Sequence, residues 1–165
     1  MNPMFFQWKD VKGRGRGLTF DDVLIVPSKS DVRSRRDPKL TSKLTKTRYL
    51  DTPIISANMD TVTEVDMAVA MHKMGGLGIL HRFATIEDQV GYVKKVREQG
   101  VTGISASIGV GDDFKERAKA LIEAGVEIIT IDIAHGHSVA MTEVMKWLKD
   151  SFSKIEIIIG YFYNE

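Results

Sequence analysis

The sequence contains no cysteine, which excludes disulfide bonds, thiolate metal ligands and a cysteine nucleophile within its 165 residues. It has no marked excess of either charge: the net charge is +1, so composition gives no reason to expect nucleic acid as a partner. No apolar run approaches the roughly 18 residues that a membrane span needs, and there is no signal-peptide core. These absences lead us to expect a cytoplasmic enzyme or binding domain with no membrane partner.

The residues that are present are typical of one globular domain, with 43% hydrophobic and 27% charged residues. Residues 1–17 end in the basic, glycine-rich "KDVKGRGRG" and are predicted to form a flexible lead-in, with a phosphate-facing arm as the alternative. Residues 18–165 are predicted to form the folded domain.

Short β-branched runs alternate along this domain with stretches of helical spacing. The predicted strands cover residues 53–56, 77–80, 103–107, 128–132 and 155–159. The predicted helices between them cover residues 64–74, 86–99, 112–124 and 139–150. This alternation is typical of right-handed βαβ units with a parallel sheet. A further apolar run, residues 22–27, is consistent with a short strand closed by Pro27.

Single residues mark the ends and faces of these helices. Thr85 and Ser138 are expected to be N-caps, and Gly125 is expected to end the third helix. His72 follows the apolar spacing of the first helix, so we expect it to have a structural role on the apolar face.

Two parallel α/β architectures fit this pattern, the doubly wound open sheet and the (β/α)8 (TIM) barrel. The first strand-to-helix turn, "SANMDTVTE", lacks the G-x-G-x-x-G of nucleotide-binding doubly wound sheets, which favours the barrel. A whole barrel takes about 250 residues, whereas this chain has four βα units and a fifth strand. The predicted fold is therefore the N-terminal half of a TIM barrel.

Polar residues gather where the predicted strands end, which is where (β/α)8 barrels carry their chemistry. They are Asn58, Asp60, Thr61 and Thr63 after the first strand, His81 and Arg82 after the second, Ser105 and Ser107 on the third, and residues 132–138 after the fourth.

Several roles are open to these residues individually. His135 and His137 could bind zinc with Asp132, but this is a weak ligand set, and a Ser–His–Asp triad has no G-x-S-x-G turn to support it. Asp132 could instead accept hydrogen bonds from the backbone of the next turn, or from a ribose hydroxyl. Arg82 is either an exposed loop cation or a phosphate contact.

Two other stretches have similar alternatives. Met59 fits either a core position or an apolar surface against a flat base. The run "RSRR" at residues 33–36 is either a solvated charge cluster or a clamp for an anionic ligand.

Taken together, "LTFDDVLIVP", "PIISANMDTVTE", "GGLGILHRF", "SASIGVG" and "IDIAHGHS" resemble the N-terminal half of the IMP dehydrogenase/GMP reductase family. The resemblance covers roughly residues 18–160. Within the family, "ANMDT", "HRF", "SRRD" and "IDIAHGHS" are most similar to bacterial GMP reductases. Only a helix-sized interval separates "HRF" from "GISAS", which leaves no room for the regulatory module that most IMP dehydrogenases carry there.

The resemblance implies roles for particular residues. The contacts of the family to its dinucleotide fall on Ser34, Arg35, Arg82, Asp132, Ile133 and Ala134. Asp132 would then lie near a ribose hydroxyl, and the two arginines would face phosphates of NADPH. Asn58 and Met59 would lie beside the purine nucleotide, and no metal site is expected among these residues.

The implied activity is the NADPH-dependent conversion of GMP to IMP and ammonia, through a covalent adduct on a cysteine. The alternatives are an IMP dehydrogenase-like protein, or a non-catalytic half-barrel that binds nucleotide or self-associates. In each case we expect a homo-oligomer.

The sequence departs from the family at its end. The family continues with I-x-G-N-V-x-T, a phosphate loop, the catalytic cysteine, a potassium-binding turn and three more strands. Here Gly160 matches and "YFYNE" does not. The resemblance therefore implies a truncated product, an expressed fragment or a partial gene, without the family's nucleophile and potassium site and inactive by itself.

Overall fold

The computed structural model describes residues 19–160, so the predicted lead-in at residues 1–17 lies outside the described part. The chain divides into two compact units, one ending at Pro38 and the other beginning at Lys39. In the first unit, a 3-10 turn, η1 (Phe20–Asp22), begins after Thr19, whose backbone N–H donates to the Asp22 carboxylate at 2.9 Å.

The prediction of a strand over residues 22–27 is wrong. Residues 23–27 have no regular structure, and the side chains of Leu24 and Ile25 are 93% and 96% exposed. The described part of this unit contains no strand whose backbone could pair with them. An apolar run of this length forms a strand only when such a partner is present.

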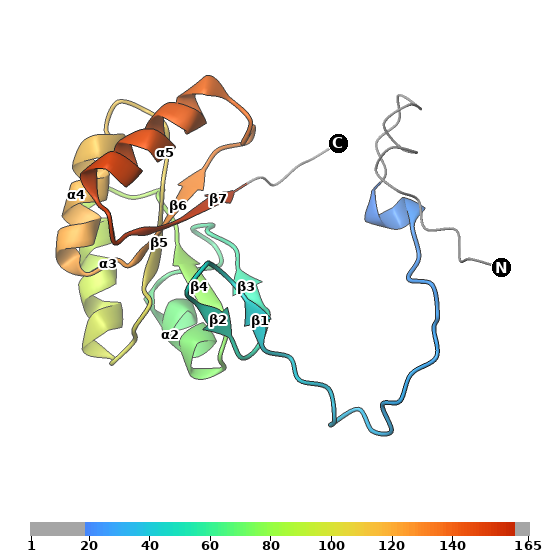
Figure 1. Cartoon of the computed structure of the whole chain (residues 1–165). Coiled ribbons are helices and arrows are strands. Elements are labelled where there is room, and N and C mark those ends of the chain that lie inside the picture. Colours follow the sequence, from blue (N-terminus) through green and yellow to red (C-terminus); the bar gives the residue numbers. More distant parts are fainter. Residues whose placement is uncertain (1–18, 161–165) are drawn as a thin grey trace. The chain divides into compact units, whose positions relative to one another are not determined.

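The second unit is a five-stranded parallel sheet with helices between its strands (Figure 1). The strands are β3 (Ile55–Ser56), β4 (Leu77–Leu80), β5 (Ser105–Ile108), β6 (Ile128–Asp132) and β7 (Glu156–Gly160), and they pair in chain order. The intervening helices are α2 (Val65–Lys73), α3 (Ile86–Glu98), α4 (Phe114–Ala124) and α5 (Val139–Ser151). This confirms the predicted α/β fold with four βα units and a fifth strand, and each bound agrees with the sequence to within two residues.

The helix ends form as their sequences predict. The Thr85 hydroxyl accepts from the backbone N–H of Asp88 at 3.1 Å, and the Ser138 hydroxyl accepts from that of Met141 at 3.2 Å. Gly125 follows α4 with a φ of +115°, a conformation that other residues rarely adopt. The role expected for His72 is not found, because its side chain is exposed in the last turn of α2.

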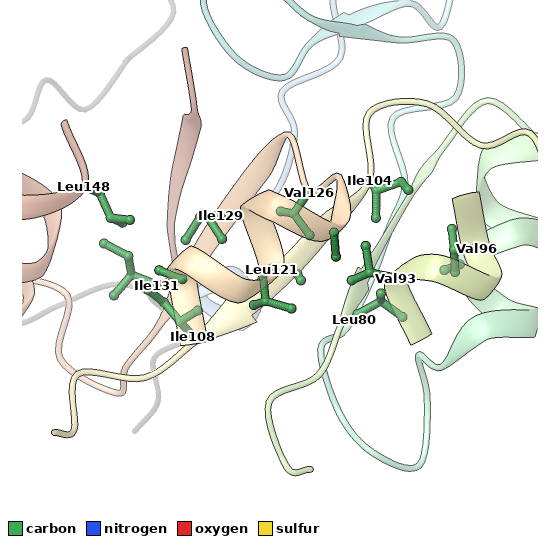
Figure 2. Packing of buried hydrophobic residues seen from close by; sticks show 14 of the residues in the cluster. Leu80, Val93, Val96, Ile104, Ile108, Leu121, Val126, Ile129, Ile131 and Leu148 are labelled. Carbon is green, nitrogen blue, oxygen red and sulfur yellow. The ribbon is translucent and has the colours of Figure 1, made fainter. Parts of the chain in front are cut away.

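The main core lies between the sheet and the helices that cover it (Figure 2). Alternate residues of β6 divide between the two faces of the sheet: Ile129 and Ile131 belong to this core, whereas Ile128 packs in a smaller cluster with Leu77 and Ile79. Leu121 of α4 is fully buried in the main core. Burial of each such side chain contributes about 1.5–3 kcal/mol.

An antiparallel hairpin, β1 (Ser42–Lys43) and β2 (Tyr49–Leu50), packs against the smaller cluster through Leu44 and Leu50. Within it, the Arg48 guanidinium binds the carboxylates of Glu127 and Glu156, which stand at the amino ends of β6 and β7. Ion pairs therefore hold the amino ends of β6 and β7. The polar residues that the sequence singles out lie at the opposite, carboxyl ends of the strands.

Candidate functional site

Arg82 and Asp132 form an ion pair across the carboxyl edge of the sheet. Arg82 comes two residues after β4 and Asp132 is the last residue of β6, and β5 lies between these strands. The Arg82 Nε donates to Asp132 Oδ2 at 2.9 Å. The arginine side chain crosses the end of β5 at Gly109, where an added Cβ would lie 3.5 Å from Arg82 Nη1. The two residues singled out by sequence are thus brought together although 50 positions separate them.

The pair leaves part of the arginine free for a ligand. Among the nitrogens of the Arg82 guanidinium, only Nε donates to an acceptor within residues 39–160. Both Nη groups therefore remain available for an anionic partner. The side chain is 36% exposed and its guanidinium carbon lies 4.9 Å from the centroid of the Phe83 ring. Asp132 accepts from Arg82 and not from the backbone of its own turn, which was one of the alternatives.

His81, the residue before Arg82, is held in one orientation by its contacts. Its ring is 2% exposed, and Nδ1 accepts from the backbone N–H of Phe83 at 3.1 Å, so the proton of the neutral ring lies on Nε2. Nε2 faces the Glu64 carboxylate at 3.4 Å. The ring of Tyr92 lies 5.8 Å from that of His81, and burial and then the charges of Glu64 and Asp88 raise the pKa of Tyr92 above its ordinary value.

The turn after β3 exposes one predicted substrate residue and buries the other. Asn58 is 7% exposed and Met59 is 51% exposed. The turn is fixed by Thr63, whose hydroxyl lies 2.8 Å from Ser56 Oγ and 2.6 Å from the Ala57 carbonyl oxygen. Met59 is therefore presented on a rigid turn at this edge and is not a core residue.

The loop after β6 opens to solvent. Ile133 is half-buried and Ala134 is exposed, as are His135 and His137. A cavity of about 370 Å³ is lined by residues 135–137 and by Ile159 of β7. In the part of the chain that the structure describes, no three His, Cys, Asp or Glu side chains come together as a metal site.

Ser34 and Arg35 lie in the other unit, within a turn. The backbone N–H of Ser34 donates to the Asp37 carboxylate at 2.9 Å, and that of Asp37 donates to the Ser34 carbonyl at 3.1 Å. Arg35 and Arg36 are exposed at the corner of this turn. Their approach to Arg82 and Asp132 stays a prediction.

Two further polar residues support this edge, Gln89 and Arg117, and neither was predicted from the sequence. Gln89 is fully buried on the face of α3 that also carries Val93 and Val96. Its sequence signal was a polar residue at an apolar helical position, three residues after Ile86 and four before Val93.

The described part of the chain is thus a parallel α/β half-barrel whose polar groups gather at the carboxyl ends of its strands. Residues 17–164 match the family model described as the IMP dehydrogenase / GMP reductase domain, and the chain belongs to this family. Among the residues that the structure describes, no helix is long and apolar enough to cross a membrane.

Relatives under both names of the family match the chain. An inosine-5'-monophosphate dehydrogenase of Cryptosporidium parvum is 36% identical over 196 residues, covering 93% of this chain and 48% of the relative. The corresponding protein of Nitrosopumilus maritimus is 50% identical over 97 residues, covering 59% of this chain and 20% of the relative. A GMP reductase of Leishmania donovani is 49% identical over 81 residues, covering 49% of this chain and 16% of the relative. The chain spans about half the length of the first of these relatives, and less of the other two.

Proposed function

We propose that the chain is the cofactor-binding half of an oxidoreductase of purine nucleotides, and specifically of one that converts GMP to IMP and ammonia with NADPH. The observation that carries the proposal is the Arg82–Asp132 pair at the carboxyl edge of the sheet. It places a carboxylate, which can accept from a ribose hydroxyl, beside a guanidinium with unused donors, which can bind phosphate.

The donor set of this edge fits a dinucleotide. Arg82 would bind a phosphate through its Nη groups, Asp132 would accept from a ribose hydroxyl, and Ile133 and Ala134 would line the pocket beside it. Ser34 and Arg35 would complete the phosphate contacts, which is the basis for proposing NADPH. When bound, the reduced nicotinamide supplies a hydride.

The purine nucleotide is assigned to the turn after β3. Asn58 supplies amide donors and acceptors from a largely buried position, and Met59 offers an exposed, polarizable thioether surface to a flat base. The rigid Thr63 turn keeps both residues at the edge that carries Arg82 and Asp132.

A second candidate is an IMP dehydrogenase-like function. It is favoured by the relatives of that name, one of which matches 93% of the chain. The interval between β4 and β5 supports the reductase, because α3 is its only helix. A half-barrel that binds nucleotide without catalysis is the remaining alternative.

Calorimetric titration of the purified chain with NADPH tests the cofactor site. We expect weak binding, and we expect Arg82→Ala to weaken it by about 1 kcal/mol or more, the usual scale for a charge-assisted contact. Lys119→Ala is the control, because Lys119 is an exposed cation on α4 to which no role in the site is assigned. Equal heats for the wild type and Arg82→Ala would remove Arg82 from the site, and tighter binding of NAD than of NADPH would favour the dehydrogenase.

A further inference from the structure

Gln89 of α3 joins the ends of β4 and β5 at the point where their pairing stops. The register of these strands ends at Leu80 and Ala106. Just beyond it, the Gln89 Nε2 donates to the carbonyl oxygens of His81 and Ser107, both at 2.9 Å. The side chain is fully buried. One amide group therefore replaces the backbone pairing that these two strands no longer make.

Arg117 of α4 fixes the orientation of that amide. Its Nη1 donates to Gln89 Oε1 at 2.9 Å and to the carbonyl oxygen of Ala84 at 3.1 Å. Its Nε donates at 2.8 Å to the carboxylate of Asp113, the residue that precedes α4. With Oε1 occupied by an obligate donor, the NH2 group of Gln89 must face the two carbonyls.

These bonds converge on the backbone that carries Arg82. The carbonyl of His81 and the N–H of Arg82 belong to one planar peptide group, so Gln89 holds the peptide from which the Arg82 side chain starts. The carbonyl of Ser107 lies two residues before Gly109, where the Arg82 side chain crosses β5. The Ser107 hydroxyl adds a bond to the Leu80 carbonyl at 3.0 Å.

We propose that Gln89, oriented by Arg117, is a positioning residue that aims Arg82 at Asp132 and at the cofactor phosphate. The orientation of Arg82 toward the cofactor phosphate rests on the proposed function, whereas its orientation toward Asp132 does not. A side chain that starts from a fixed peptide loses less conformational freedom when its guanidinium binds a ligand. Gln89 contacts neither Asp132 nor the proposed phosphate position, and it acts on Arg82 only through the backbone.

Two substitutions of Gln89 remove its donors in different ways. Gln89→Glu keeps the shape, keeps an acceptor for Arg117 and places an oxygen against the two carbonyl oxygens. Gln89→Met keeps the volume and removes all three hydrogen bonds of the side chain. If one of the two variants does not fold, the other still tests the proposal. Glu127→Gln is the control, because it weakens an ion pair at the opposite ends of the strands and leaves the carboxyl edge intact.

The first readout needs no ligand. In nuclear magnetic resonance spectra of the full chain, the Arg82 Nε–H, hydrogen-bonded to Asp132, should exchange slowly with solvent. We expect this exchange to accelerate at least about fivefold in either Gln89 variant, the equivalent of one lost hydrogen bond, and to be unchanged in Glu127→Gln. An unchanged Arg82 Nε–H in a folded Gln89 variant would show that Gln89 serves stability alone.

The second readout is titration with NADPH at a temperature where every variant is folded. The dissociation constant should rise about fivefold or more in the Gln89 variants and stay constant in Glu127→Gln. If the wild type binds no NADPH, the proposed function fails, and the Nε–H exchange still decides whether Gln89 positions Arg82. Faster exchange with unchanged NADPH affinity would overturn the cofactor part of the inference.

Discussion

At the scale of single residues, the clearest charge effects lie at the amino ends of the strands. Partial burial acts to raise the pKa of Glu156, but hydrogen bonds from Thr47 and Thr45 and the charge of Arg48 outweigh it. The pKa of Glu156 therefore lies below its ordinary value. For Glu127, partial burial is likewise outweighed by Arg48 and by the backbone N–H of Gly103, so its pKa is lowered too.

Because its pKa is lowered on folding, the Glu156 carboxylate stabilises the fold at pH values above the pKa that it has in the unfolded chain, near 4.5. This stabilisation is lost as the pH falls through the pKa of the carboxyl in the folded chain. We expect Glu156→Gln to unfold more easily at pH 7, by about 1 kcal/mol, and to lose less stability than the wild type between pH 5 and 3. Urea unfolding at several pH values measures both effects. Glu143→Gln, at an exposed position on α5, is the control, and parallel pH profiles for wild type and Glu156→Gln would contradict the assignment.

At the scale of elements, each helix is held by the side chains that it buries against the sheet. Leu121 is the fully buried leucine of α4 and lies three residues before the end of the helix at Ala124. The exposed run at residues 23–27 is the opposite case, since it is apolar but has no strand to pair with in its unit. Apolar character alone therefore does not make an element.

We expect Leu121→Ala to lower the free energy of unfolding by about 2–5 kcal/mol, because the substitution leaves a cavity in the core that the sheet and helices cannot fill. Thermal or urea unfolding followed by circular dichroism measures the loss. Lys119→Ala, on the exposed side of the same helix, should change stability by less than about 0.5 kcal/mol. A similar loss from both substitutions would mean that α4 contributes through helix propensity and not through packing.

At the scale of the whole molecule, the sheet has an open edge. In the described residues, β7 pairs only with β6. An unpaired strand edge is a template for another chain. We expect the purified chain to self-associate, with a dimer that joins two half-barrels as the simplest product.

Light scattering at micromolar concentration tests this prediction. Ile159→Lys places a charge on the edge strand and should reduce association. A monodisperse monomer of the wild-type chain would rule out the edge as an association site.

We also expect these 165 residues alone to have no reductase activity. The proposed reaction needs a nucleophile that forms a covalent purine adduct, and the sequence has no cysteine. Loss of a nucleophile costs on the order of a millionfold in turnover in comparable enzymes. The measurement is NADPH absorbance in the presence of GMP. Turnover that persists in the wild type after extensive purification and disappears in Arg82→Ala would overturn this expectation.

The order of strands and helices, the half-barrel class and most helix ends could be predicted from the sequence, because these depend on local patterns. Apolar spacing sets which residues face the core, and Thr85, Ser138 and Gly125 act within a few residues of their own positions. The sequence also singled out Arg82 and Asp132 separately, through the resemblance of their motifs to a family.

The contacts between these residues depend on the assembled fold and could not be predicted from local patterns. Arg82 and Asp132 are 50 positions apart, and Arg48 and Glu156 are 108 apart, so their contacts exist only after the strands have assembled in order. Gln89 is marked in the sequence as a polar residue at an apolar helical position, but its partners could not be predicted, because they are backbone carbonyls, which carry no residue-type signal. The two backbone carbonyls that it binds come together only where β4 and β5 lie side by side.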